Sequence, residues 1–139
     1  MAEASPPDVE EVVRAVEGLH SGDVSNLDVY AESASFYGPD IPDGIHGRDA
    51  YENYAQEVVP AFPDLRLSVD DVLASDEVVM VEWTWTGTHE GEFEGIAPTG
   101  REVEIRGMTK AVIADGKIQE ERGYYDLQDF LAQLGITDE

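Results

Sequence analysis

Two stretches in the first half of the chain carry apolar residues at helical spacing. The first set comprises Val9, Val12, Val13, Val16 and Leu19. The second set comprises Tyr51, Tyr54, Ala55, Val58 and Val59. A recurrence every three to four residues predicts amphipathic helices, here over residues 8–20 and 49–59. Between them we expect a short helical turn over 24–30, a short strand over 34–37 and a loop over 39–47, which is rich in proline and glycine.

From residue 65 onward the apolar period changes to two, which is typical of half-buried strands. Leu65, Leu67 and Val69 begin the alternation. One predicted strand face then carries Val79, Val81, Trp83 and Trp85. A later face carries Val103, Ile105, Gly107, Thr109, Ala111 and Ile113. Asp115-Gly116 is a strong hairpin signal, the next strand runs from 117 to about 125, and a short helix follows.

The order of these elements is helices first, then a mostly antiparallel meander, then one short helix. This segregation predicts a single α+β domain over residues 1–139, with 1–7 as a flexible tail. The sheet has one apolar face, so the helices must cover that face. A helix laid across a curved sheet encloses a cavity, and we therefore expect an internal pocket of the kind that binds small ligands.

The charge adds an expectation about the environment. The 139 residues include 31 acidic and 8 basic side chains, for a formal net charge of −23. Such a chain repels nucleic acid and anionic membranes. Self-repulsion of this size favours unfolding unless salt screens it, which indicates a halophilic, cytoplasmic protein with an acidic surface. An acidic surface for a basic partner is the alternative.

The chain contains no cysteine, so disulfides and thiolate metal sites are excluded. The first eleven residues lack the basic and apolar regions of a secretory signal. Asp40, Asp43 and His46 are the one hint of a metal cluster, but their spacing fits no metal motif, so we expect a solvated acidic loop and no metal. No phosphate-binding glycine loop and no serine nucleophile elbow is present.

Four stretches in the last two-thirds of the chain resemble one family. Residues 87–101 read GTHEGEFEGIAPTGR, and residues 115–118 read DGKI, followed by Glu120 and by Tyr125-Asp126. Residues 61–64 read AFPD, and residues 47–50 read GRDA. Together they resemble SnoaL-like polyketide cyclases, which share the nuclear-transport-factor-like and ketosteroid-isomerase-like fold.

The resemblance implies a cone-shaped fold, often dimeric, and members that bind aromatic polyketides or other compact apolar molecules. Some members close rings by intramolecular aldol chemistry without a cofactor or metal. We therefore expect a homodimer and no cofactor here. This chain departs from the family at Thr109, where many relatives carry His, and at Arg122, where many carry an aromatic residue.

Asp126 matches the family's acid–base carboxylate. Proton abstraction beside a carbonyl needs a base held against the substrate and away from water. A carboxylate in an apolar cavity also has its pKa raised by desolvation. Asp126 directly precedes the last helix, so the alternative is an N-cap that accepts a hydrogen bond from the backbone near Asp129.

If the last strand is regular, its alternate residues Ile118, Glu120, Arg122, Tyr124 and Asp126 share one face. Glu120 and Arg122 would then pair and orient a ligand oxygen, and Tyr124 would donate a hydrogen bond to an enolate oxygen. The alternative is a solvated strand face.

Other side chains complete the set of candidate site residues. His89 shares alternation with the two tryptophans, which makes it either an acid–base group or a hydrogen-bonding partner of a neighbouring loop. Trp83, Trp85, Tyr51 and Tyr54 are aromatic core residues, some of which would line the pocket.

These observations leave two hypotheses. The first is a cofactor-independent acid–base enzyme that acts on a small, apolar carbonyl compound as a cyclase, isomerase or hydrolase. Asp126 would then be the acid–base group, helped by His89, while Tyr54, Trp83, Trp85, Thr109, Glu120, Arg122 and Tyr124 would contact the ligand. The second is a non-catalytic module of the same fold, used for small-molecule binding or dimerisation. A collapsed cavity, or Asp126 outside it, would favour the second.

Overall fold

The computed structural model describes residues 9–19, 27–93 and 95–136. The predicted tail over 1–7 therefore lies outside the described residues, as do the two ends of the predicted first helix. The elements run in the order α1 (Val9–Leu19), a 3₁₀ helix η1 (Leu27–Val29), β1 (Tyr30–Gly38), β2 (Ile41–His46), α2 (Arg48–Ala61), β3 (Arg66–Ala74), β4 (Val78–Thr88), β5 (Glu102–Ala114), β6 (Lys117–Tyr125) and α3 (Leu127–Gln133).

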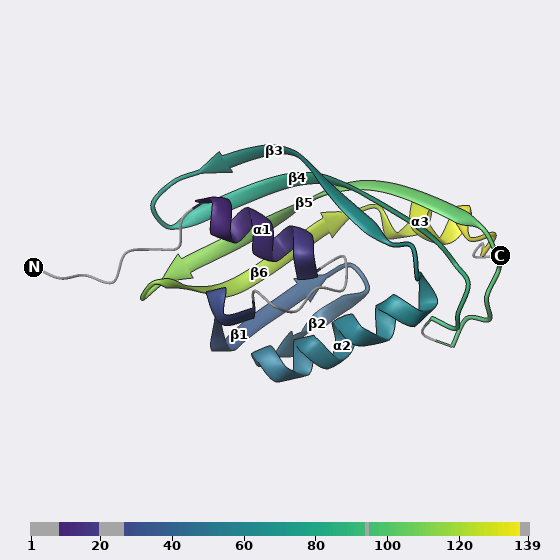
Figure 1. Cartoon of the computed structure of the whole chain (residues 1–139), viewed down its shortest axis with the longest axis horizontal. Helices are drawn as coiled ribbons and strands as arrows, with labels where there is room; N and C mark the ends of the chain where they lie inside the picture. Colours follow the sequence, from purple (N-terminus) through teal and green to yellow (C-terminus); the bar gives the residue numbers. More distant parts are fainter. Residues whose placement is uncertain (1–8, 20–26, 94, 137–139) are drawn as a thin grey trace, which may run out of the picture.

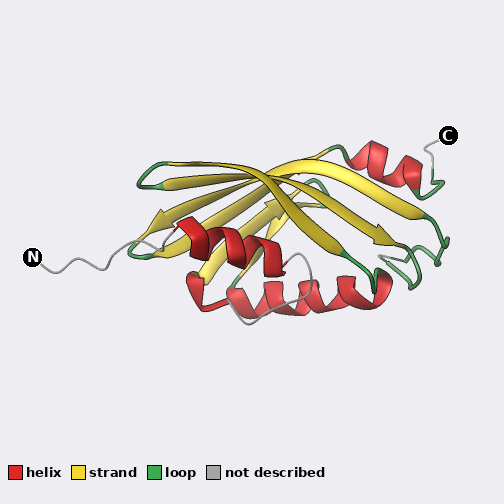
Figure 2. Cartoon of the chain, turned by 45° about the horizontal axis from the view of Figure 1, so that its top comes forward, coloured by secondary structure: helices red, strands yellow, loops and turns green. Residues whose placement is uncertain are grey.

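The six strands form one curved sheet in the order β2-β1-β6-β5-β4-β3. Strands β1 and β6 are parallel, and every other neighbouring pair is antiparallel. Helices α1 and α2 lie on one face of the sheet, and α3 lies at the far end of the long strands (Figure 1). Figure 2 shows the same two layers with the strands curving over α1 and α2. The α+β architecture expected from the sequence is confirmed.

The alternation predicted for β4 and β5 is confirmed by burial. Val79, Val81 and Trp83 of β4 face the core, and Ile105 and Ala111 of β5 face it beside them. Their neighbours in each strand point to the opposite face. The core therefore fills the space between the concave face of the sheet and the helices, which is also where a ligand can be enclosed.

The expected loop over 39–47 is wrong, because most of it is strand β2. Pro42 and Gly44 argued against a strand, but β2 lies at the edge of the sheet and pairs with β1 alone. An edge strand tolerates a proline, since one side of its backbone needs no partner. Gly44 has a φ of 85°, and a Cβ atom there would lie 2.5 Å from the ring of Tyr37, so the position requires glycine.

Two other boundaries differ from the prediction. Strand β1 extends over Tyr30–Gly38 rather than 34–37, so that Tyr30 is a strand residue and fully buried. Helix α2 continues through Pro60 to Ala61, because the hydrogen bond that a proline omits is in the last turn of the helix. No helix in the described part of the chain is long and apolar enough to cross a bilayer.

Candidate functional site

A cavity of about 130 Å³ lies between the concave face of the sheet and helix α2. Its volume is close to that of cavities of about 150 Å³ that hold one benzene ring. The wall is mostly aromatic and aliphatic. The residues that line it are Tyr37, Gly38, Asp40, Ile41, Tyr51, Tyr54, Ala55, Val58, Phe62, Leu65, Leu67, Trp83, Trp85, Phe93, Ile105, Thr109, Glu121, Gly123, Tyr125 and Phe130.

Glu121 places a carboxylate in this wall. Its side chain comes from the middle of β6 and is 4 % exposed. Among the described residues it is the one acidic side chain that is fully buried. The hydroxyl of Tyr30, which is itself buried, donates a hydrogen bond to Glu121 Oε1. A buried carboxylate needs such a donor, because burial without one would leave the charge uncompensated.

Two buried phenols surround this carboxylate. Burial raises the pKa of Tyr30 well above its usual value, and the charge of Glu121 and its hydrogen bond raise it further. Burial also raises the pKa of Tyr51, with smaller contributions from the charges of Glu121 and then of Asp40. Both phenols therefore stay protonated across the neutral range and act as hydrogen-bond donors. Tyr51 lines the cavity together with Glu121 and Asp40.

Asp40 supplies a second carboxylate to the wall, from the turn that joins β1 to β2. The hydroxyl of Tyr54, on helix α2, donates a hydrogen bond to Asp40 Oδ2. Burial, followed by the charge of Asp40, raises the pKa of Tyr54. Each carboxylate of the wall thus has a phenol partner: Asp40 has Tyr54, which also lines the cavity, and Glu121 has Tyr30, which does not. None of its lining residues is a lysine, an arginine or a histidine.

Thr109 carries a hydroxyl into the cavity from β5. Trp83 Nε1 donates a 2.8 Å hydrogen bond to Thr109 Oγ1, and both side chains are buried. The oxygen of Thr109 is therefore occupied as an acceptor, and its own hydrogen can be donated to a ligand. Thr109 pairs with Gly123 and Ala111 pairs with Glu121, so Thr109 and Glu121 are diagonal neighbours on the same face. Such neighbours lie about 7 Å apart, which leaves room for a small substrate group between them.

The prediction that Glu120, Arg122, Tyr124 and Asp126 share a face with Ile118 is wrong. A β-bulge interrupts β6, because Ile113 pairs with Ile118 while Val112 pairs with Glu120, which leaves one extra residue. The bulge reverses the alternation after Ile118.

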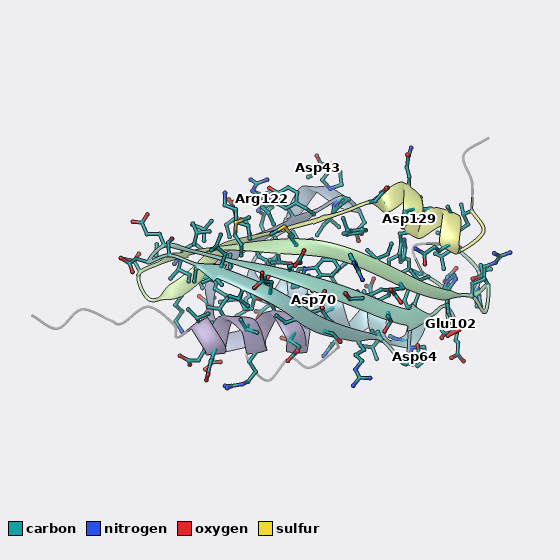
Figure 3. The ribbon with its side chains drawn as sticks, turned by 90° about the horizontal axis from the view of Figure 1, so that it is seen from above. Asp43, Asp64, Asp70, Glu102, Arg122 and Asp129 are labelled. Atoms are coloured by element: carbon teal, nitrogen blue, oxygen red, sulfur yellow. The ribbon has the colours of Figure 1, made fainter. Side chains whose placement is uncertain are left out.

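The reversal determines which side chains reach the cavity. The inward residues of β6 after the bulge are Glu121, Gly123 and Tyr125. Glu120, Arg122 and Tyr124 point to the outer face instead. Arg122 Nε donates to Glu120 Oε2 at 2.7 Å, so the predicted pair exists, but outside the cavity. Arg122 also lies over the ring of Tyr37, 4.1 Å from its centroid, and Tyr124 is 53 % exposed. Figure 3 looks onto this outer face, where Arg122 is labelled.

Asp126 is the N-cap of α3 and is exposed. Its Oδ1 accepts a hydrogen bond of 3.1 Å from the backbone N–H of Asp129. It does not line the cavity. The geometry therefore matches the capping alternative and gives Asp126 no contact with an enclosed substrate.

His89 is fully buried but also lies outside the cavity wall. Its Nδ1 accepts from the backbone N–H of Thr99 at 3.2 Å and lies 3.1 Å from Thr99 Oγ1. The ring stacks on Phe62, with centroids 5.3 Å apart. This is the second of the two readings of the sequence, in which His89 holds a neighbouring loop.

Four predicted ligand contacts do reach the cavity wall, namely Tyr54, Trp83, Trp85 and Thr109. Neither Glu121 nor Tyr30 was predicted as a site residue from the sequence, and Asp40 was expected in a solvated acidic loop. Tyr30 was missed because its segment was expected to be helical. No group of three or more histidine, aspartate and glutamate side chains among residues 9–19, 27–93 and 95–136 is arranged to hold a metal ion.

Comparisons with known proteins agree with this architecture. The profile of the SnoaL-like polyketide cyclases matches residues 10–134, so the chain belongs to that family. No curated protein matches the chain. A proposed SnoaL-like polyketide cyclase from Jannaschia sp. CCS1 is similar in fold, with a TM-score of 0.80 at 22 % identity, over 94 % of this chain and 92 % of that one.

Two Streptomyces structures are also similar. IdmH from Streptomyces antibioticus, a proposed polyketide cyclase, has 29 % identity and a TM-score of 0.74, over 91 % of this chain and 97 % of its own. AclR from Streptomyces galilaeus, a proposed hydroxylase, has 25 % identity and a TM-score of 0.72, over 91 % and 96 %. Members with this fold are thus assigned to different reactions, so activity must be argued from the cavity.

Proposed function

We propose that this protein is a cofactor-independent acid–base enzyme that acts on a compact, mostly apolar carbonyl compound. The observation that carries the proposal is the buried Glu121 carboxylate in the wall of an apolar cavity, with a phenol donating to it. General acid–base catalysis needs such a group within reach of the substrate and shielded from water. Glu121 takes the role that the sequence suggested for Asp126.

The chemistry follows from the positions of Glu121 and Thr109. A substrate carbon next to a carbonyl group loses a proton to the Glu121 carboxylate, and its bonding electrons move onto the carbonyl oxygen. The enolate oxygen accepts a hydrogen bond from the Thr109 hydroxyl, whose orientation Trp83 fixes. Return of the proton from Glu121 to another atom of the substrate completes an isomerisation. In an aldol ring closure, the enolate carbon attacks a second carbonyl group, and Glu121 returns the proton to the alkoxide oxygen that forms.

Hydrogen exchange tests this proposal without knowledge of the natural substrate. Cyclohexanone and acetophenone are single-ring ketones that match the cavity volume, and proton NMR in D₂O follows deuterium uptake beside their carbonyl groups. The protein should accelerate the uptake, and Glu121→Gln should lower the acceleration by about 10²–10⁴-fold. Glu120→Gln changes the adjacent carboxylate on the outer face and should leave the rate unaltered.

A second candidate function is a non-catalytic small-molecule-binding module. It is favoured by the positions of Asp126 and His89, both of which lie outside the cavity wall. The two functions give different results in the same experiment. Ketones that bind in the cavity but exchange at the solvent rate would support the module, and equal rates for Glu121→Gln and wild type would contradict the catalytic role of Glu121.

A further inference from the structure

The charges in the cavity wall are of one sign. Two of the twenty lining residues are acidic, Asp40 and Glu121, and none is basic. Arg122 and Arg48 are not among the lining residues, and each has another partner. Arg122 pairs with Glu120 on the outer face, and Arg48 donates to the backbone oxygen of Tyr30 at 3.1 Å.

The remainder of the wall is dominated by aromatic rings. They belong to Tyr51, Tyr54, Phe62, Trp83, Trp85, Phe93, Tyr125 and Phe130. The ring of Tyr37 instead lies under Arg122 on the outer face. Several of the lining rings contact one another. Tyr51 and Tyr54 have centroids 5.5 Å apart, and Phe62 and Trp85 have centroids 5.0 Å apart. The faces of aromatic rings attract cations, most strongly where water is excluded.

From this combination we infer that the cavity selects a ligand with a compact organic cation, such as a substituted ammonium group. Carboxylates compensate the charge, rings enclose the alkyl groups, and a cavity of about 130 Å³ admits a group of one-ring size. An anionic ligand would meet two like charges and no basic side chain in the wall. The inference rests on the proposed function in that it takes the same cavity as the substrate site, and it names the substrate class as carbonyl compounds that carry an amine.

Within this arrangement Asp40 and Glu121 have different tasks. Asp40 lies in the turn between β1 and β2 and is partly exposed, so it can meet a cation that enters from solvent. Glu121 is fully buried and faces Thr109 diagonally, so it remains the group for proton transfer.

A pair of isosteres tests the selectivity by titration calorimetry at one fixed KCl concentration. Choline and 3,3-dimethylbutan-1-ol have the same shape, and they differ in a nitrogen cation against a neutral carbon. The wild-type protein should bind choline at least about tenfold more tightly than the neutral alcohol. It should bind the anion 3,3-dimethylbutyrate most weakly. Equal affinities, or a preference for the neutral alcohol, would overturn the inference, and this comparison requires no variant.

Variants then locate the preference. Asp40→Asn should reduce the choline preference by about tenfold, and Asp43→Asn should preserve it, because Asp43 is exposed in the neighbouring strand and does not line the cavity. A choline preference that survives both Asp40→Asn and Glu121→Gln would show association with the acidic surface, which also overturns the inference. The proposed function and this inference can fail separately. If the protein binds choline selectively but does not accelerate ketone exchange, the inference holds for ligand binding and the proposed catalysis is contradicted.

Discussion

Glu120 and Glu121 are neighbours in the chain, but they lie on opposite faces of β6. Glu120 has a guanidinium partner in Arg122 and a side chain 32 % exposed. Glu121 has a phenol partner in Tyr30, is 4 % exposed, and lines an apolar cavity. A surface pair of the first kind contributes little to stability, because water screens it and side-chain entropy opposes it.

The difference shows that residue type alone does not determine which side chain of β6 can contact a ligand. Both residues are glutamates, and the bulge near Gln119 decides which one faces the ligand. The same comparison extends to the tyrosines, since Tyr30 and Tyr51 are fully buried while Tyr124 is exposed. Three experiments test this contrast between the inner and outer faces.

The largest effect is expected from alkaline pH. The pKa values of Tyr30, Tyr51 and Tyr54 are raised in the folded protein by burial and by the nearby carboxylates. Their contribution to stability is therefore complete below the unfolded pKa of about 10, and it is lost as the pH rises above that value. Each tyrosine should lower the free energy of unfolding by about 1.4 kcal/mol per pH unit, so that the three together give about 4 kcal/mol per pH unit.

Urea unfolding between pH 9 and 11.5 measures this slope. Tyr30→Phe should reduce it by about one third, since one of three titrating phenols is removed. Tyr124→Phe removes a phenol from the outer face and serves as the matched control. A slope that is the same for wild type and Tyr30→Phe would contradict the assignment of Tyr30 to the inner, charge-coupled set.

The sequence was sufficient for most of the fold. Alternation predicted which residues of β4 and β5 face the core, and the Asp115-Gly116 turn was found where the hairpin signal stands, with positive φ at both residues. It failed at β2, where edge position overrides the presence of Pro42. Local patterns do not reveal which strand is at an edge, because that depends on the pairing of the whole sheet.

For the site, the sequence predicted inward side chains of the regular strands β4 and β5. It did not predict the inward carboxylate of β6, which contains a bulge. Trp83 and Thr109 were predicted correctly as inward, because β4 and β5 keep their alternation. Glu121 was not predicted, since a bulge adds one residue without a signature in the residues around it.

An effect of intermediate size on stability is expected from alanine substitutions at two glycines, Gly107 and Gly123. A Cβ atom at Gly107 would lie 2.5 Å from the backbone oxygen of Tyr124 and 2.6 Å from the Trp83 ring. At Gly123, the nearest atom would be the backbone oxygen of Tyr37 at 3.8 Å. Gly107→Ala should therefore destabilise the protein by about 1–3 kcal/mol through overpacking. Gly123→Ala should leave stability unaltered and place a methyl group in the cavity.

Urea unfolding and a titration with 3,3-dimethylbutan-1-ol separate these effects. We expect Gly123→Ala to bind the alcohol more weakly than wild type, because Gly123 lines the cavity. Equal loss of stability in both variants would mean that the inward face of β6 at Gly123 is as tightly packed as β5 at Gly107. Unaltered binding by Gly123→Ala would place the ligand elsewhere.

The smallest effect is expected at Asp126, where the capping and catalytic roles are separable. Asp126→Ala removes the acceptor for the Asp129 N–H and should cost about 1 kcal/mol of stability. Asp126→Ser keeps a capping oxygen without a carboxylate and should restore most of that loss. Because Asp126 does not line the cavity, both variants should retain the wild-type rate of ketone exchange once they are folded. If Asp126→Ser instead keeps its stability but no longer accelerates exchange, the carboxylate of Asp126 takes part in the chemistry. The catalytic groups would then not be confined to the residues that face the cavity.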